Sequence, residues 1–234
     1  MQIVGLVIGR GNNTLPDKNI RLVKGVPLLM WGVRALRKCS GVSNIFVSTE
    51  CPKIKKISDQ RGIPVINRPN ELSNESSSSS DVVRHAAKTM GEEFGIDFDL
   101  LILVHGNVGT ISGDQITQAI DVLINNPSLS SVIPVHTNSE YSPYRCFKEF
   151  NGKLSPFVKN ELISPNRQGN PTVYFPNHSF WCLTKRGIFE SESGPWPCWG
   201  NSIGFVEQPG SFDVHSEEDL IRTENWLNEQ KVEY

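Results

Sequence analysis

The sequence predicts an α/β fold with a mostly parallel, doubly wound sheet, and three observations support this prediction. Residues 3–8 form an unbroken apolar run, which is typical of a strand buried on both faces. Residues 100–104 form a second such run, and we expect the segment 99–105 around it to be a central strand. In the first 65 or so residues, strand-like and helix-like segments alternate, as they do in βαβ units of a parallel sheet.

The alternation can be followed along the chain. Residues 28–38 have helical apolar spacing, and Pro27 fits the first turn of that helix. We expect further strands at 44–49, 62–67, 131–136 and 204–206, a turn followed by a strand at 174–183, and further helices at 52–61, 81–87, 112–125 and after 216. The serine run at 76–80 indicates an ordered loop and a helix cap rather than a linker.

The alternation breaks between residues 137 and 172, where the chain is polar, aromatic and rich in proline and asparagine. This segment is too long for a plain loop. It contains a candidate hairpin at 147–157, with Asn151-Gly152 as its turn. Long aromatic segments that cannot bury themselves are typical of a homodimer interface. We therefore expect one domain spanning residues 1–234, with a dimerisation arm inserted at 137–172.

Composition limits the function classes. The 234 residues are enough for one α/β domain, and a net charge of −2 without a basic block argues against a nucleic-acid surface. No apolar run approaches the roughly 20 residues of a membrane span, and the chain starts on a strand rather than on a signal-peptide pattern. We expect a cytoplasmic enzyme without nucleic-acid or membrane partners. The five cysteines are scattered, so buried thiols are the expected interpretation.

The loop after the first strand is a candidate phosphate-binding loop. It reads Gly9-Arg10-Gly11-Asn12-Asn13. Two glycines allow the backbone to turn close to a ligand, and free N–H groups with Arg10 and Lys18 nearby suit an anion such as a nucleoside triphosphate. The loop is neither a Walker loop nor a complete dinucleotide fingerprint. The residues alone leave the phosphate loop and an ordinary strand-to-helix turn about equally supported.

Two further residues have two interpretations each. His105 follows the expected central strand, and ligands of doubly wound sheets bind beyond the carboxyl ends of the strands. It could bond a phosphate, a sugar hydroxyl or a metal, or it could be a neutral histidine satisfied by the backbone. Arg68 could steer an anionic ligand, or it could form a structural salt bridge.

Taken together, these segments resemble a known family. After the first loop come Leu15-Pro16-x-Lys18-Asn19-Ile20 and Gly25-x-Pro27-Leu28-Leu29-x-Trp31. They look like the start of the acylneuraminate and keto-deoxy-octulosonate cytidylyltransferases, which make CMP-activated acidic sugars. Further matches follow in the family's order: Ser48-Thr49, Arg68-Pro69, Arg167-Gln168, Pro176-Asn177, Asp213 and Glu218-Asp219. The resemblance runs from Met1 to about Leu227.

The resemblance implies a Rossmann-like sheet of the nucleotide-diphospho-sugar transferase type, with an arm that exchanges with a second subunit. It also implies transfer of CMP from CTP to an acceptor oxygen with release of pyrophosphate, supported by Mg²⁺ or Mn²⁺. The acceptor would be an acidic sugar of the sialic-acid or octulosonate kind, or another acidic oxygen nucleophile such as a phosphonate or a sugar phosphate.

The site residues that the resemblance implies fall into four sets. The catalytic set is Arg10, Lys18 and Asp213. The remaining nucleotide-binding residues are Gly9, Gly11, Asn12, Asn13 and Arg68. The acceptor-binding residues are His105, Asn107, Arg167, Gln168 and Asn177. The metal ligands are Asp213 and His215.

The chain departs from the family where chemistry is expected. Asn13-Thr14 stand in for a loop lysine, and residues 105–111 replace the family's Gln-Pro-Thr-Ser-Pro-Leu-Arg beside the acidic sugar. His178 replaces a glycine, and His215 replaces the second magnesium-binding aspartate, although Mg²⁺ prefers oxygen. Because the catalytic set persists, we expect an active enzyme with a divergent acceptor. The alternatives are a non-catalytic nucleotide-binding relative and a nucleotidyltransferase with another base or acceptor.

Overall fold

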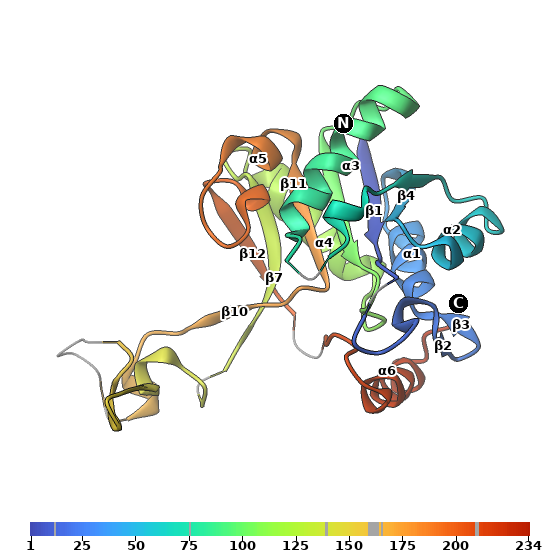
Figure 1. The fold of residues 1–234 in the computed structure, drawn as a ribbon. Coiled ribbons are helices and arrows are strands. Elements are labelled where there is room, and N and C mark those ends of the chain that lie inside the picture. Colours follow the sequence, from blue (N-terminus) through green and yellow to red (C-terminus); the bar gives the residue numbers. More distant parts are fainter. Residues whose placement is uncertain (12, 75, 139, 159–163, 165, 209–210) are drawn as a thin grey trace.

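The computed structural model describes residues 1–234 except 12, 75, 139, 159–163, 165 and 209–210 (Figure 1). Its centre is an eight-stranded sheet in the order β10-β7-β11-β6-β1-β4-β5, with β12 paired to β7. The strands are β1 (Ile3–Ile8), β4 (Val42–Thr49), β5 (Val65–Asn67), β6 (Leu100–His105), β7 (Ser131–Thr137), β10 (Tyr174–Pro176), β11 (Phe180–Thr184) and β12 (Ile203–Glu207). The two apolar runs of the sequence, β1 and β6, are neighbours at its middle.

Most of the sheet is parallel, as predicted. β1 pairs in parallel with β4 and β6, β4 with β5, and β12 with β7. β11 runs antiparallel between β6 and β7, and β10 runs antiparallel to β7. The start of β11 therefore lies at the same edge as the carboxyl ends of β1, β6 and β7. This brings residues 177–179 next to His105, whose N–H donates to the Ser179 carbonyl at 3.2 Å.

Helices cover both faces of the sheet. One hydrophobic cluster joins the sheet to α1 (Leu28–Lys38), α2 (Pro52–Asp59) and α4 (Gly113–Asn125), and another joins the opposite face to α3 (Ser79–Phe94) and α5 (Lys185–Glu190). A glycine lets α1 approach β1, because a Cβ at Gly5 would lie 2.8 Å from Leu36 Cδ1. Side chains define the helix starts: Ser78 caps α3, and Ser112 forms a capping box on α4.

The last helix returns to the beginning of the chain. α6 (Glu217–Glu229) starts at a capping box on Ser216 and packs with Val214 against α1 and the small hairpin of β2 (Leu22–Val23) and β3 (Val26–Pro27). Five short 3₁₀ helices complete the described elements: η1 (Lys18–Ile20), η2 (Asn70–Leu72), η3 (Pro143–Arg145), η4 (Arg167–Gly169) and η5 (Pro197–Trp199).

Between β7 and β10 an arm extends away from the sheet (Figure 1). It carries the predicted hairpin, formed by β8 (Phe147–Phe150) and β9 (Lys153–Pro156). Asn151 and Gly152 both have positive φ, 52° and 73°, as a tight two-residue hairpin turn requires. The dimerisation role of this arm stays a prediction.

Three sequence predictions differ from the structure. The strand expected at 62–67 is only Val65–Asn67, because Gly62 turns the chain with a φ of 64° and Pro64 lacks an N–H. Pro27 belongs to β3 and precedes α1 rather than lying in its first turn. Residues 174–176, expected in a turn, are strand β10, which lies against the end of β7.

Candidate active site

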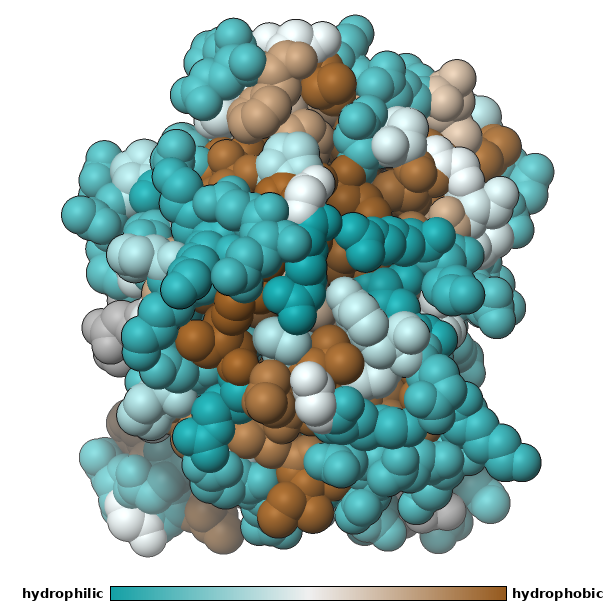
Figure 2. Space-filling model, turned by 90° about the vertical axis from the view of Figure 1, so that its right-hand side faces the viewer, coloured by the Kyte–Doolittle hydropathy of each residue, from teal (hydrophilic) through white to brown (hydrophobic). Residues whose placement is uncertain are grey.

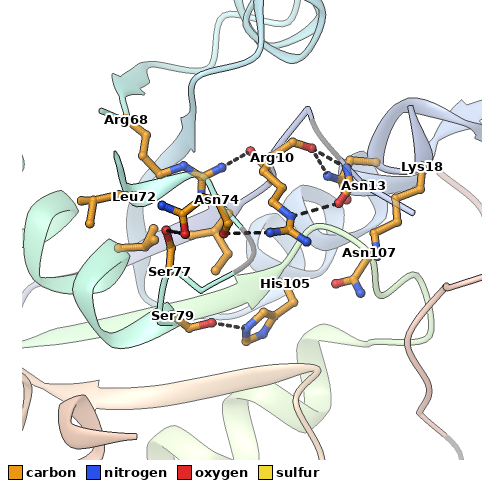
Figure 3. Close-up of a pocket in the computed structure, with 14 residues that line it drawn as sticks. Arg10, Asn13, Lys18, Arg68, Leu72, Asn74, Ser77, Ser79, His105 and Asn107 are labelled. Carbon is orange, nitrogen blue, oxygen red and sulfur yellow. Dashed lines mark hydrogen bonds between the residues drawn. The ribbon is translucent and has the colours of Figure 1, made fainter. Parts of the chain in front are cut away.

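A cavity of about 270 Å³ opens at the carboxyl ends of β1 and β6 (Figure 3). The first loop, the end of β6 and residues 68–82 surround it. Its lining residues are Ile8, Gly9, Arg10, Asn13, Lys18, Asn19, Arg68, Leu72, Asn74, Ser77, Ser79, Val82, His105 and Asn107. This is the edge at which open α/β sheets bind their ligands. Seven of the predicted site residues therefore line the same cavity: Gly9, Arg10, Asn13, Lys18, Arg68, His105 and Asn107.

Arg10 extends across the cavity and is held at both ends (Figure 3). Its Nε donates to Asn13 Oδ1 at 3.4 Å, and its Nη1 donates to the Asn74 carbonyl at 2.8 Å. The Arg10 carbonyl in turn accepts from the side-chain amides of Asn13 and Asn19 at 2.7 and 2.8 Å. The guanidinium is therefore positioned before any anion arrives, which reduces the entropic cost of binding.

Lys18 is the second cation of the cavity, and it is almost fully buried. Its Nζ donates to the Val214 carbonyl at 3.2 Å. Burial lowers the pKa of Lys18 below its usual value, and Arg10 adds to the lowering while Asp213 opposes it. Within the described part of the chain this carbonyl is the one hydrogen-bond acceptor of the buried ammonium, which favours an additional anionic partner.

The structure gives Arg68 the structural role that the sequence left open. Its Nη2 donates to Glu50 Oε2 at 2.8 Å and to the Gly9 carbonyl at 2.7 Å, with both side chains largely buried. Glu50 also accepts from the Gly11 N–H at 2.6 Å. The Gly11 amide is therefore engaged by a carboxylate, and Gly11 lies beside Cys51 rather than in the cavity lining. Arg68 and Gly11 thus shape the loop, and their role as nucleotide ligands stays a prediction.

His105 ends β6 and forms part of the cavity wall. Its Nε2 lies 3.4 Å from Ser79 Oγ, and its ring packs edge-on against Trp181 at 5.0 Å between centroids. Burial lowers the pKa of His105 to about 4, although Asp213 opposes the shift. The imidazole is therefore neutral at physiological pH and offers one donor and one acceptor.

Asp213 lies on a segment that is bonded to two residues of the cavity lining, Lys18 and Asn107, through its neighbour Val214. The Val214 N–H next to it donates to the Asn107 carbonyl at 2.9 Å, which ties this segment to the end of β6. His215 Nε2 lies 3.9 Å from Asp213 Oδ2, and its side chain is 68% exposed.

Among the described residues there is no group of three or more His, Cys, Asp or Glu that could hold a metal. Mg²⁺, however, is commonly held by one or two carboxylates together with substrate phosphates. The Asp213 carboxylate fits that requirement better than the exposed His215 imidazole, because Mg²⁺ prefers oxygen ligands.

The remaining predicted residues lie elsewhere. Asn177 is buried at the start of β11, where its Oδ1 accepts from the Ser179 N–H at 2.9 Å and its own N–H donates to the Pro134 carbonyl at 2.8 Å. Gln168 lines a separate cavity of about 430 Å³ on the arm, together with Arg145. Asn12 and the Arg167 side chain lie outside the described residues. Gln168 and Asn177 of this chain are therefore not among the residues that line the cavity at the ends of β1 and β6.

Sequence reasoning missed the far wall of the cavity. Leu72, Asn74, Ser77, Ser79 and Val82 form it. Asn74 organises the loop, because its Oδ1 accepts from the side chains of Ser76 and Ser77 at 2.7 and 3.0 Å. The run of serines at 76–80 is the available sequence signal, and it predicts a loop and a helix cap but no contact with the cavity.

Comparisons with known proteins find relatives of this chain. A family described as cytidylyltransferase matches residues 5–189. N-acylneuraminate cytidylyltransferase A of Danio rerio is 27% identical over 187 residues, covering 80% of this chain and 42% of that protein. The 3-deoxy-manno-octulosonate cytidylyltransferase of Bdellovibrio bacteriovorus is 25% identical over 137 residues, covering 58% of this chain and 51% of that protein. The chain spans about half the length of the curated relatives it matches.

Solved structures show the same fold. A CMP:2-keto-3-deoxy-manno-octonic acid synthetase complexed with CTP superposes with a TM-score of 0.72 at 15% identity, covering 98% of this chain and 100% of that one. A 4-diphosphocytidyl-2C-methyl-D-erythritol synthase superposes with a TM-score of 0.65 at 10% identity, covering 97% and 98%. Across the described residues, no helix has the length and apolar character needed to cross a membrane. Because the family match covers most of the sequence, the chain belongs to the cytidylyltransferase family.

Proposed function

We propose that this chain transfers CMP from CTP to an acidic sugar, or to another acidic oxygen nucleophile such as a phosphonate, and releases pyrophosphate. The observation that carries the proposal is the cavity at the ends of β1 and β6, which Arg10 and Lys18 both line and where Lys18 bonds to Val214, the neighbour of Asp213. Two cations and one carboxylate at a sheet edge suit a triphosphate accompanied by a metal. The family membership of the chain supports the same reaction.

The reaction needs positioning more than covalent chemistry. An oxygen of the acceptor attacks the α-phosphorus of CTP, and the bond from that phosphorus to the bridging oxygen of the leaving pyrophosphate breaks. Negative charge grows on the phosphate oxygens, and the fixed guanidinium of Arg10 and the buried ammonium of Lys18 stabilise it. Asn13 and Asn19 keep the Arg10 backbone in place through their side-chain amides.

We propose Mg²⁺, replaceable by Mn²⁺, as the metal, with Asp213 as its protein carboxylate and Asn107 as a neighbouring oxygen donor. Such a metal neutralises charge on the triphosphate when it is bound. The hydrogen bond from Val214 to the Asn107 carbonyl supports this pairing, because it holds the two residues on abutting segments. His215 would then act on Asp213 from the exposed side rather than as a main ligand.

We also propose a homodimer in the cytoplasm. The arm exposes large apolar side chains that a monomer would leave in water: Tyr141, Phe147, Phe150, Leu154 and Phe157. On the face of the molecule opposite to the arm, hydrophilic side chains cover most of the surface, and hydrophobic atoms show in the hollows among them (Figure 2). The arm is therefore the proposed contact with a second copy. Gln168, which lies on the arm and outside the lining of the nucleotide cavity, would reach the acceptor across such a dimer.

Pyrophosphate release tests the reaction. Purified protein with Mg²⁺ is offered CTP, ATP, GTP or UTP together with a panel of acidic sugars and phosphonates. We expect release with CTP and at least one acceptor, and we expect the Lys18→Ala variant to lose it. The exposed Lys88 of α3 provides the matched control, Lys88→Ala, which should retain the rate. Absence of both pyrophosphate release and CTP-dependent thermal stabilisation would contradict the proposal, whereas stabilisation alone would indicate the non-catalytic relative.

A further inference from the structure

The loop between β6 and α4 contacts the segment that carries Asp213. We call this loop, residues 106–111, the platform loop. The Thr110 side chain in it is fully buried, and its Oγ1 accepts from the Phe212 N–H at 3.2 Å. The same Oγ1 lies 3.3 Å from Ser211 Oγ, close enough for one hydroxyl to donate to the other. A single threonine hydroxyl therefore contacts both residues that precede Asp213.

The residue that follows Asp213 is anchored to the same loop. The Val214 N–H donates to the Asn107 carbonyl at 2.9 Å, and the Val214 carbonyl accepts from Lys18 Nζ at 3.2 Å. Lys18 and Asn107 both line the cavity, and Figure 3 shows them on the same side of it. Hydrogen bonds from the platform loop thus hold the backbone on both sides of Asp213 next to the cavity lining.

The platform loop also supports the helix that follows this segment. A Cβ at Gly109 would lie 2.7 Å from Thr223 Cγ2 of α6 and 3.1 Å from Leu28 Cδ1, so the absence of a side chain allows this close approach. At the start of α6, Asp219 Oδ2 accepts from the His215 N–H at 3.0 Å, and Thr223 Oγ1 donates to the Asp219 carbonyl at 2.7 Å. The segment is therefore fixed between the platform loop and a helix that itself rests on that loop.

Precise placement of Asp213 matters because the proposed metal has one protein carboxylate. The resemblance to the family implies a second aspartate at position 215, but this chain has His215, whose side chain is 68% exposed. Mg²⁺ demands near-octahedral oxygen geometry, which a single carboxylate completes together with waters and substrate phosphates. Hydrogen bonds that fix a ligand from behind commonly decide how well it binds a metal. The Thr110 hydroxyl is placed to do this, because it holds the backbone before Asp213.

We propose that Thr110 is a positioning residue for the metal-binding carboxylate and acts on Asp213 through the backbone of Phe212. With the hydroxyl present, the segment holds the carboxylate in one place beside the cavity. Without it, the Phe212 N–H loses its acceptor and the carboxylate samples several positions, so metal binding weakens while Arg10 and Lys18 still hold the nucleotide. The inference rests on the proposed function, because it assumes that a nucleotide and a metal bind in the cavity.

Isothermal titration with CTP, once with Mg²⁺ and once with EDTA, provides the first test. Thr110→Val keeps the shape of the side chain but removes the hydroxyl. We expect it to weaken CTP binding about fivefold with Mg²⁺ and not at all with EDTA. Thr110→Ser keeps the hydroxyl and should bind as the wild type does. The control is Thr89→Val, which should change neither affinity, because Thr89 is also buried but its hydroxyl donates to the His85 carbonyl within α3.

A double-mutant cycle separates positioning from a general structural effect. In the Asp213→Asn background the carboxylate is absent, so adding Thr110→Val should cause no further loss of CTP affinity with Mg²⁺. A merely structural role of Thr110 would weaken binding equally in both backgrounds. Equal losses in the two backgrounds, or wild-type affinity in Thr110→Val, would overturn the inference while leaving the proposed function intact. No CTP binding by the wild type in either condition would refute the proposed function and the inference with it.

Hydrogen exchange followed by mass spectrometry tests the contact without nucleotide or metal. We expect the peptide that spans residues 211–216 to exchange faster in Thr110→Val, because the Phe212 N–H loses its acceptor, and at the wild-type rate in Thr110→Ser and Thr89→Val. Should Thr110→Val not fold, Ser211→Ala takes its place, because it removes the hydroxyl partner of Thr110 at a half-buried residue and should also speed exchange. Unchanged exchange in the variant tested would overturn the inference.

Discussion

At the scale of single residues, the buried pair of Arg68 and Glu50 holds the first loop to the sheet. Burial pushes the pKa of Glu50 upward, but the Gly11 N–H and the Arg68 guanidinium outweigh it and lower the pKa. The carboxylate is therefore charged in the folded protein, and its partners keep Gly9 and Gly11 in place. Removing either member leaves an unpaired buried charge.

We expect Arg68→Met to destabilise the protein by about 3–5 kcal/mol, the usual cost of breaking a buried ion pair. Urea unfolding followed by circular dichroism measures this change. Arg37→Met, at an exposed position near the end of α1, is the matched control and should change the free energy of unfolding little. Equal effects of the two substitutions would show that the Arg68 pair adds nothing specific.

His105 makes stability depend on pH. The unfolded chain takes up a proton on His105 as the pH falls below about 6.5, whereas the folded protein does so only near pH 4. The contribution of neutral His105 to the free energy of unfolding is therefore fully present above pH 6.5 and is lost as the pH falls toward 4. At about 1.36 kcal/mol per pKa unit, the shift from 6.5 to about 4 limits the loss to about 3.4 kcal/mol. Thermal melting of the wild type should decline more steeply between pH 6.5 and 4 than that of His105→Gln, and parallel curves would exclude this role.

Residue patterns predicted part of the candidate site. Gly9, Arg10, Asn13 and Lys18 follow one strand closely in sequence, so their grouping at its end follows from chain connectivity. His105 and Asn107 were placed there by the rule for parallel sheets. Two other features depend on how loops distant in sequence contact each other: the ion pair of Arg68 with Glu50, and the hydrogen bond from Arg10 to Asn74. Local sequence patterns do not predict such contacts.

At the scale of elements, the ends of β1 and β6 are held together by a glycine. The Gly106 N–H donates to the Ile8 carbonyl at 2.8 Å. A Cβ at position 106 would lie 2.8 Å from that same carbonyl oxygen and 3.3 Å from Leu29 Cβ. Backbone on one side and a buried helix on the other leave little room for adjustment.

We expect Gly106→Ala to separate the two strand ends and to weaken CTP binding more than it lowers the melting temperature. Isothermal titration with CTP and Mg²⁺, alongside thermal melting, measures the two effects. Gly91→Ala serves as control, because a Cβ there meets no atom within 4 Å. Unchanged CTP affinity in Gly106→Ala would show that the strand ends tolerate the added carbon.

Elements were predictable where a local pattern decides them. α1 covers 28–38 as expected, because its apolar residues recur at helical spacing and the proline before them marks the start of the helix. β10 was missed because it has only three residues and forms by pairing with the end of β7, a contact distant in sequence. The hairpin of β8 and β9 was found from its Asn-Gly turn alone.

At the scale of the whole molecule, the arm should decide the oligomeric state. Phe150 and Leu154 are 69% and 72% exposed on its hairpin. We expect the double variant Phe150→Asp and Leu154→Asp to convert a dimer to a monomer in size-exclusion chromatography with light scattering. The melting temperature of the monomer reports whether its sheet remains intact. A monomeric wild type, or a variant that stays dimeric, would contradict the dimer proposal.

Lys18 lies in the loop after β1 and bonds to the Val214 carbonyl, although the two residues are 196 positions apart in the sequence. α6 completes the packing around β2, β3 and α1. During synthesis on a ribosome, all the strands of the sheet are translated before Asp213. A nascent chain that has completed its sheet therefore still lacks the carboxylate proposed for the metal. We expect nucleotide affinity to appear only after translation has passed residue 213.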